Sequence, residues 1–241
     1  MAKPVSDASP QTYARIAGLL YLFIIVAGGL GELFIRDKLV VSGDAAATAA
    51  RIMASESLWR LGIIGDLAMH VCDVVVMWAI YVLLRPVNRK LALLVLLFNL
   101  VQTAVLVANK STLLVPLFLL GNAPYLHAFD PAQLQAWSYI AIRMHERGFG
   151  IGLIFFGFVC LMEGYLIRKS GYLPRLIGWL MQIAGVCYLV NSVALLLAPA
   201  VAASMFPAIL MPCLIAETSF ALWLLVKGVN VDEWERRANL T

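Results

Sequence analysis

Six long apolar runs, separated by short connections, constrain what this chain of 241 residues can fold into more than any other feature. Each run is close to the ~20 residues that a helix needs to cross the hydrocarbon core of a bilayer. The runs cover about residues 13–35, 58–84, 90–119, 149–167, 173–198 and 208–227. Hydrophobic residues make up 62% of the chain and charged residues 13%, against about 45–50% and about 25% in soluble domains.

The apolar runs favour helices over barrel strands. They are continuously apolar and lack the alternation that strands of a membrane barrel need. A helix satisfies every backbone hydrogen bond internally, which the bilayer core demands. We therefore predict an all-α, polytopic bundle of about six transmembrane helices, forming a single membrane domain over residues 1–241. The short connections leave no room for a separate soluble catalytic domain.

Lysine and arginine residues predict how the bundle is oriented. The connections on one side are shorter and richer in these residues, so we place that side in the cytoplasm. The first apolar run shows no signal-peptidase site and is interpreted as a retained span. With six spans, both termini are then cytoplasmic. The basic side holds Lys3, Arg15, Arg85, Arg89, Lys90, Arg168, Lys169, Arg175, Lys227, Arg236 and Arg237, and the opposite side holds Arg36, Lys38, Arg51, Arg60, Arg143 and Arg147.

Two segments on the non-cytoplasmic side are long enough to form helices of their own. Residues 43–57 are interpreted as a short interfacial helix that Asp44 caps. Residues 130–147 begin with Asp-Pro, a helix start signal, and lead into the fourth run. We expect this second segment to lie on or enter the membrane, and the two segments to form a lid over the outer mouth of the bundle. The polar stretch 230–241 is expected to be a solvated tail.

The net charge and the cysteines argue against several classes of protein. The net charge is only +4, and the basic residues are scattered between apolar runs, which argues against nucleic-acid binding. The expected partner is the lipid bilayer, with a small-molecule or lipid ligand possible and the oligomeric state open. The cysteines lie inside apolar runs and form no C-x-x-C pair, so we interpret them as packing residues rather than a thiol oxidase centre. They are Cys72, Cys160, Cys187 and Cys213.

Two regions of the chain carry glycine-rich apolar patterns. One reads Ser-Gly-Tyr-Leu-Pro-Arg-Leu-Ile-Gly-Trp-Leu at 170–180 and continues as Gly-Val-Cys-Tyr-Leu-Val-Asn-Ser at 185–192; the other reads Ala-Arg-Ile-Ala-Gly-Leu-Leu-Tyr-Leu at 14–22. The chain thereby resembles the DUF4386 family of bacterial membrane proteins. The resemblance implies a multi-helix protein of the bacterial cytoplasmic (inner) membrane. It implies no activity, because that family has no established function.

The second apolar run contains the most informative polar residues. Asp66, His70 and Asp73 fall at positions i, i+4 and i+7, within about a 60° arc of one helix. Ionisable residues inside a span cost about 2.5–3.5 kcal/mol each on insertion scales, so they face the bundle interior and are paired or functional. We therefore predict that these three residues form the centre of an intramembrane ligand pocket.

The other runs supply further polar residues for that pocket. On the third run, Lys110 is the expected counter-charge for Asp66, because the second and third spans are adjacent and antiparallel. The predicted pocket is completed by Asn99, Gln102, Lys110, His145, Glu163 and Glu217. No catalytic residue is assigned.

Three functions remain open from these residues. The first is a pocket that binds or transports a small polar or amphipathic ligand. The second is a membrane-embedded acid–base or metal-assisted enzyme acting on a lipid-like substrate. The third is a structural or interaction protein, whose polar network only fixes the register of the helices. Asp66, His70 and Asp73 are residue types that can bind a metal ion, and they share one face of a helix. Zinc sites usually need more histidine or cysteine, so these residues are weak metal candidates. No cofactor is implied.

Overall fold

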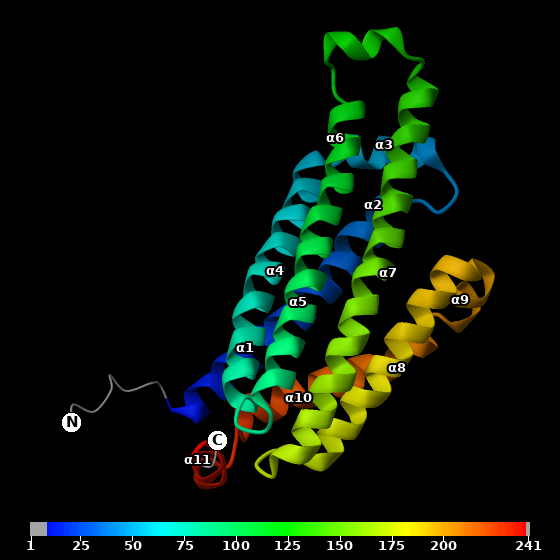
Figure 1. The fold of residues 1–241 in the computed structure, drawn as a ribbon. Coiled ribbons are helices and arrows are strands. Elements are labelled where there is room, and N and C mark those ends of the chain that lie inside the picture. Colours follow the sequence, from blue (N-terminus) through cyan, green and yellow to red (C-terminus); the bar gives the residue numbers. More distant parts are fainter. Residues whose placement is uncertain (1–8, 240–241) are drawn as a thin grey trace.

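The computed structural model describes residues 9–239, and these residues form helices joined by short connections (Figure 1). Predictions about Lys3 and about residues 240–241 fall outside that range. The elements are α1 (Pro10–Gly31), η1 (Glu32–Arg36), α2 (Asp37–Leu39), α3 (Ala45–Ala54), α4 (Glu56–Leu84), α5 (Arg89–Asn109), η2 (Lys110–Leu114), α6 (Val115–Leu119), η3 (Pro124–Ala128), α7 (Pro131–Ser170), α8 (Arg175–Leu197), α9 (Pro199–Met205), η4 (Ala208–Leu210), α10 (Met211–Val226) and α11 (Val231–Ala238).

Six of the described helical segments are long and apolar enough to cross a membrane, which confirms the predicted all-α polytopic bundle. They are Pro10–Leu39, Glu56–Leu84, Arg89–Leu119, Pro131–Ser170, Arg175–Leu197 and Ala208–Val226. Their main helices contact one another in the order α1, α4, α5, α7, α8 and α10, and α10 returns to contact α1. The spans therefore form a closed ring, in which each helix packs against its neighbours in the sequence.

The outer surface and the interior of this ring carry different kinds of side chain. Large apolar side chains point outward all around the bundle, as lipid-facing residues do, because lipid replaces water as their solvent. Leu61, Val71, Leu176 and Leu197 are examples, each more than 60% exposed. The interior holds the main apolar cluster together with almost all of the charged residues that the spans bury.

Glycines set the distance between α7 and α8. A Cβ atom added to Gly164 would lie 2.5 Å from the carbonyl oxygen of Gly178, and one added to Gly185 would lie 2.7 Å from that of Gly157. Both distances are below van der Waals contact, so only glycine allows the two backbones to approach this closely. Small residues at membrane helix interfaces serve this purpose in general. Gly178 and Gly185 belong to the glycine-rich pattern noted in the sequence.

Helix α7 is longer than a span requires. Its 40 residues extend over about 60 Å, twice the ~30 Å thickness of a hydrocarbon core. Asp130 caps its N-terminus through a capping box with Gln133, which is why the helix begins where the Asp-Pro signal predicted. Residues 131–147 are helical as expected. They extend the fourth span in a straight line instead of folding over the bundle as a lid (Figure 1).

The short helix predicted within residues 43–57 is present as α3. Asp44 is its N-cap, and the carboxylate accepts a hydrogen bond from the backbone N–H of Ala47 at 2.8 Å. The helix packs against α4 and α7 at the end of the bundle away from the termini (Figure 1). Tyr139 of α7 also contacts this region, because its hydroxyl oxygen accepts a hydrogen bond from the backbone N–H of Gly43 at 2.7 Å.

The expectation of a solvated C-terminal tail is wrong for the described part of it. Residues Val231–Ala238 form α11, and the indole N–H of Trp234 donates to the carbonyl oxygen of Leu83 at 2.9 Å. The hydroxyl of Tyr172 donates to the same carbonyl at 2.7 Å, and burial raises the pKa of that hydroxyl. The charged residues of this segment suggested a free tail, but Trp234 anchors it to the bundle as a helix.

The two ends of the described chain lie at the same end of the bundle. The side chain of Gln11, in the first turn of α1, donates to the carbonyl oxygen of Lys227 at 3.0 Å and accepts from the N–H of Val229 at 3.0 Å. We call this end of the bundle the termini end and the other the distal end. Figure 1 shows α11 close to the start of α1.

Candidate functional site

Two buried cations share one buried carboxylate in the distal half of the bundle. Asp66 on α4 is only 3% exposed, and it forms ion pairs with Arg36 and with Lys110, whose Nζ atom lies 2.8 Å from Oδ2. The predicted pairing of Lys110 with Asp66 is therefore present. Arg36 was expected in an outer connection, and instead its guanidinium reaches into the bundle. We call Arg36, Asp66 and Lys110 the distal triad.

Irregular helical turns bring both cations to Asp66. Arg36 ends η1, a five-residue π-helical turn that follows α1, and Lys110 begins η2, a 3₁₀ turn that follows α5. A π turn is wider than an α turn and a 3₁₀ turn is tighter, so each shifts the direction of the following side chains. Gly31 lies next to the triad: a Cβ atom there would be in ordinary van der Waals contact with Arg36 Nη1 at 3.5 Å and with Asp66 Oδ1 at 3.9 Å.

The buried part of the triad carries more positive than negative charge. Glu32 also contacts Arg36, at 3.5 Å, but its side chain is 62% exposed and lies at the rim. The side chains of Arg36 and Lys110 are only 16% and 7% exposed. Inside the bundle, two cations therefore face a single carboxylate.

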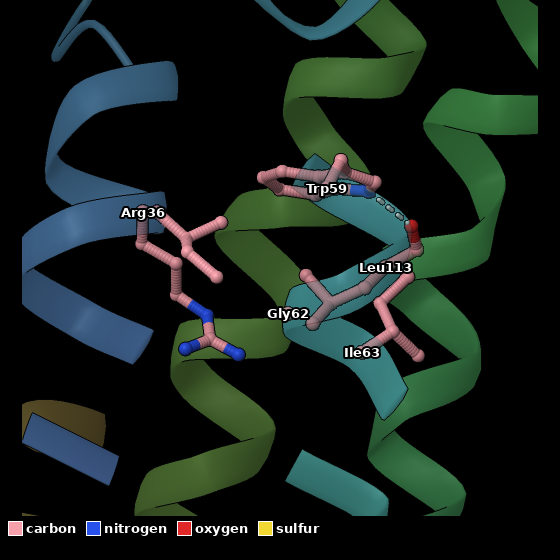
Figure 2. A pocket seen from close by; sticks show the side chains of 6 residues that line it. Arg36, Trp59, Gly62, Ile63 and Leu113 are labelled. Carbon is pink, nitrogen blue, oxygen red and sulfur yellow. Dashed lines mark hydrogen bonds between the residues drawn. The ribbon is translucent and has the colours of Figure 1, made fainter. Parts of the chain in front are cut away.

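A small hollow lies beside the triad. Its volume is only about 10 Å³, roughly what one water molecule needs and far less than the ~300–1,000 Å³ of typical small-molecule pockets. Figure 2 shows Arg36 reaching from its helix toward the face of α4 that carries Trp59 and Gly62. The indole N–H of Trp59 donates to the carbonyl oxygen of Leu113 at 2.9 Å and closes one wall. The hollow is lined by Ile35, Arg36, Trp59, Gly62, Ile63 and Leu113.

An apolar cluster adjoins the hollow on the distal side. Trp59, Ile63 and Leu113 belong to both. The buried members of the cluster are Leu39, Ile52, Trp59, Ile63, Leu113 and Ile142. The distal half thus combines an excess of buried positive charge with an apolar surface next to it.

His145 joins this region from α7. The side-chain amide of Asn109 donates to the carbonyl oxygen of His145 at 2.8 Å, and its nitrogen lies 3.1 Å from the imidazole Nδ1. Gly148 makes room for Asn109, because a Cβ atom there would come within 2.1 Å of the amide oxygen. Asn109 immediately precedes Lys110, so the predicted residue His145 lies at the level of the distal triad.

A second polar group lies nearer the middle of the bundle. Asp73 accepts hydrogen bonds from Asn99 at 3.0 Å and from Thr103 at 2.5 Å. The pairs Asp66–Lys110 and Asp73–Thr103 define the antiparallel register of α4 and α5. In that register His70 lies between the two pairs, near the turn that begins at Gln102. We call Asp73, Asn99 and Thr103 the middle group.

Several buried atoms of this middle region have no hydrogen-bond partner among the described residues. They are His70 Nε2, Asn99 Oδ1 and Gln102 Oε1. Buried polar atoms in proteins are usually paired, so each unpaired atom needs an explanation such as a ligand or an ordered water. These three belong to residues that the sequence assigned to the pocket.

A third polar group lies toward the termini end. Glu217 on α10 accepts a hydrogen bond from Tyr21 of α1 at 3.0 Å and another from Tyr188 of α8. Glu163 on α7 is 1% exposed, and its Oε1 atom has no partner among the described residues. We call Glu163, Glu217, Tyr21 and Tyr188 the inner group.

The nine predicted pocket residues therefore occupy three levels along the bundle interior rather than one cavity. Asp66, Lys110 and His145 lie at the distal level, and Glu163 and Glu217 lie at the inner level. His70, Asp73, Asn99 and Gln102 occupy the region between them. Within residues 9–239, no three His, Cys, Asp or Glu side chains are arranged to hold a metal ion together.

Four residues of these groups are not among the nine predicted pocket residues: Arg36, Thr103, Tyr21 and Tyr188. Arg36 was missed because it ends an apolar run, where a basic residue is a usual topology signal. Tyr21 and Tyr188 were missed because tyrosine is common in membrane spans without a polar role. Both lie in the glycine-rich stretches that resemble a known family, and that resemblance was the one available signal for them.

The comparisons with known proteins assign the chain to a family without assigning an activity. A family model described as "Domain of unknown function (DUF4386)" matches residues 16–228, which is most of the chain. No curated protein and no solved structure matches it. The match includes every residue of the three polar groups. The chain is accordingly a six-span membrane protein that belongs to the DUF4386 family.

Proposed function

We propose that the protein binds a small amphipathic anion in the distal half of its bundle, with the anionic group at Arg36 and Lys110. The observation that carries the proposal is the buried pair of cations on the single carboxylate of Asp66. A buried charge without full compensation is costly, and a ligand carboxylate or phosphate would supply the missing negative charge. Arginine and lysine are the residues that commonly bind such groups.

The surroundings of the triad support an amphipathic ligand over a purely polar one. The hollow beside Arg36 is walled by apolar side chains and leads to the apolar cluster around Trp59 and Leu113. A π turn and a 3₁₀ turn flank the triad, and such turns often occur at functional sites because they can rearrange. A rearrangement of this kind would enlarge a hollow that is smaller than a chain-bearing ligand.

The proposal is tested by thermal unfolding of the purified protein in a nonionic maltoside detergent. The probes are laurate, which has a carboxylate, and dodecanol, which has the same chain without a charge. A ligand that binds only the folded state stabilises it, by ~2.7 kcal/mol at 100 times its Kd. We expect laurate to raise the unfolding temperature and dodecanol to leave it unchanged.

Charge-removing variants locate the effect. Arg36→Gln and Lys110→Gln should lose the response to laurate. Arg60→Gln is the matched control, because Arg60 forms an exposed ion pair with Glu56 on the outer surface of α4. Equal responses to laurate and dodecanol, or a laurate response that all three variants retain, would refute an anion site at the triad. Dodecyl phosphate then distinguishes a phosphate head group from a carboxylate.

A further inference from the structure

The inner half of the bundle collects carboxyl groups without cations. The charge of Glu217 acts on Glu163, and the charge of Asp73 acts on both. Among residues 9–239, no lysine, arginine or histidine forms an ion pair with any of these three carboxyl groups. This arrangement is the reverse of the distal triad, where cations outnumber carboxylates.

The two glutamates have different surroundings. Both oxygens of Glu217 accept hydrogen bonds from tyrosine hydroxyls, Oε2 from Tyr21 and Oε1 from Tyr188. Two donors of this kind stabilise the ionised form of a carboxyl group. Glu163 is almost fully buried, and its Oε1 atom has no donor among the described residues. Nothing described there stabilises a negative charge on Glu163.

We propose that the inner group is a proton-binding site, in which Glu163 carries a proton as a neutral carboxylic acid beside the ionised Glu217. Two negative charges this close in a medium of low dielectric constant repel strongly, and binding one proton removes the repulsion. Pairs of carboxyl groups in unlike environments often divide the protonated and ionised roles in this way. This site and the proposed anion site consist of different residues, so an experiment can refute either one without refuting the other.

The titratable groups of this region come from five helices, α1, α4, α7, α8 and α10. Its own helix contributes Cys160, α10 contributes Glu217 and Cys213, and α4 contributes Asp73. Tyr21 and Tyr188 reach the group from α1 and α8. None of these side chains is cationic, so none of them can neutralise a negative charge on Glu163.

Infrared spectroscopy tests the proposal directly. A protonated carboxylic acid gives a carbonyl stretching band that is separate from the amide bands and shifts on deuteration. The purified protein is studied at neutral pH in a maltoside detergent, which has no carbonyl group of its own. We expect one such band, its loss in Glu163→Gln, and its retention in the matched variants Glu217→Gln and Asp73→Asn.

The remaining outcomes decide against the site. Absence of the band in the unmodified protein, or its persistence in Glu163→Gln, would overturn the proposal. Disappearance of the band when sodium chloride replaces choline chloride would mean that the site holds a sodium ion instead of a proton. If Glu163→Gln does not fold, Glu163→Asp keeps the acid, and the band should then move; an unmoved band would assign the proton elsewhere.

Discussion

At the scale of single residues, the charge balance of the distal triad depends most on Asp66. It is the only carboxylate within the buried part of the distal triad, where it neutralises one of two cations. Removing it would leave Arg36 and Lys110 beside each other with only the exposed carboxylate of Glu32 as a counter-charge. We therefore expect Asp66 to contribute to the stability of the fold as well as to the charge balance of the proposed ligand site.

We expect Asp66→Asn to destabilise the protein by about 3–5 kcal/mol, because removing one partner of a buried ion pair leaves an uncompensated charge. Glu56→Gln removes the carboxylate of an exposed pair on the same helix and should cost no more than about 1 kcal/mol. Unfolding temperatures in detergent measure both effects. Similar losses in the two variants would show that the triad contributes little to stability.

Single residues also show which parts of the candidate site could be predicted from the sequence. The arc of Asp66, His70 and Asp73 was visible from helical spacing, and so was the pairing of Asp66 with Lys110, since both follow from regular helices in adjacent spans. Arg36 could not be reached, because its position depends on a π turn that no residue pattern indicated. The division into three levels was likewise hidden, because depth depends on how long helices are offset against each other.

At the scale of elements, the close approach of helices depends on individual glycines. Gly18 of α1 lies against the backbone of α10, and a Cβ atom there would come within 2.4 Å of the amide nitrogen of Leu225. Gly29, on the same helix, faces open space with no atom of another residue within 4 Å. One helix thus offers both a packed and an unpacked glycine.

We expect Gly18→Ala to destabilise the bundle by about 1–3 kcal/mol, because the added methyl group must push α1 and α10 apart. Gly29→Ala is the control, and it should be neutral or gain up to ~1 kcal/mol from helix propensity. The measurement is again thermal unfolding in detergent. A Gly18→Ala variant as stable as its control would show that the contact between α1 and α10 is looser than described.

The element scale was only partly predictable from the sequence. The six apolar spans follow from hydropathy, because length and composition are local properties. The sequence predicted that residues 130–147 lead into the fourth span, but it left open whether one continuous helix passes through the glycines at 148, 150 and 152. All three glycines make room for neighbouring side chains: Gly148 faces Asn109, Gly150 faces Leu195 and Gly152 faces Leu106. These contacts between helices are not visible in the sequence, and they determine the role of the glycines.

At the scale of the whole molecule, the basic residues in the connections predict how the bundle is oriented in the membrane. The termini end carries most of the lysines and arginines that lie in connections, and we propose that it faces the cytoplasm. Reporter fusions after Thr241 and within the connection between Arg85 and Lys90 should both report the cytoplasmic side. Fusions within residues 121–130 should report the opposite side. A C-terminal fusion that reports the opposite side would invert the proposed topology.

The length of α7 has a practical consequence for imaging this molecule. Small membrane proteins are difficult to align in electron cryomicroscopy, because a detergent micelle hides their features. Here a capped, continuous helix of 40 residues extends from the termini end past the distal end of the bundle, where it packs against α3 and α6. The projecting part is joined to the spans without a flexible hinge. An antibody fragment bound to it would report the position of the transmembrane helices faithfully.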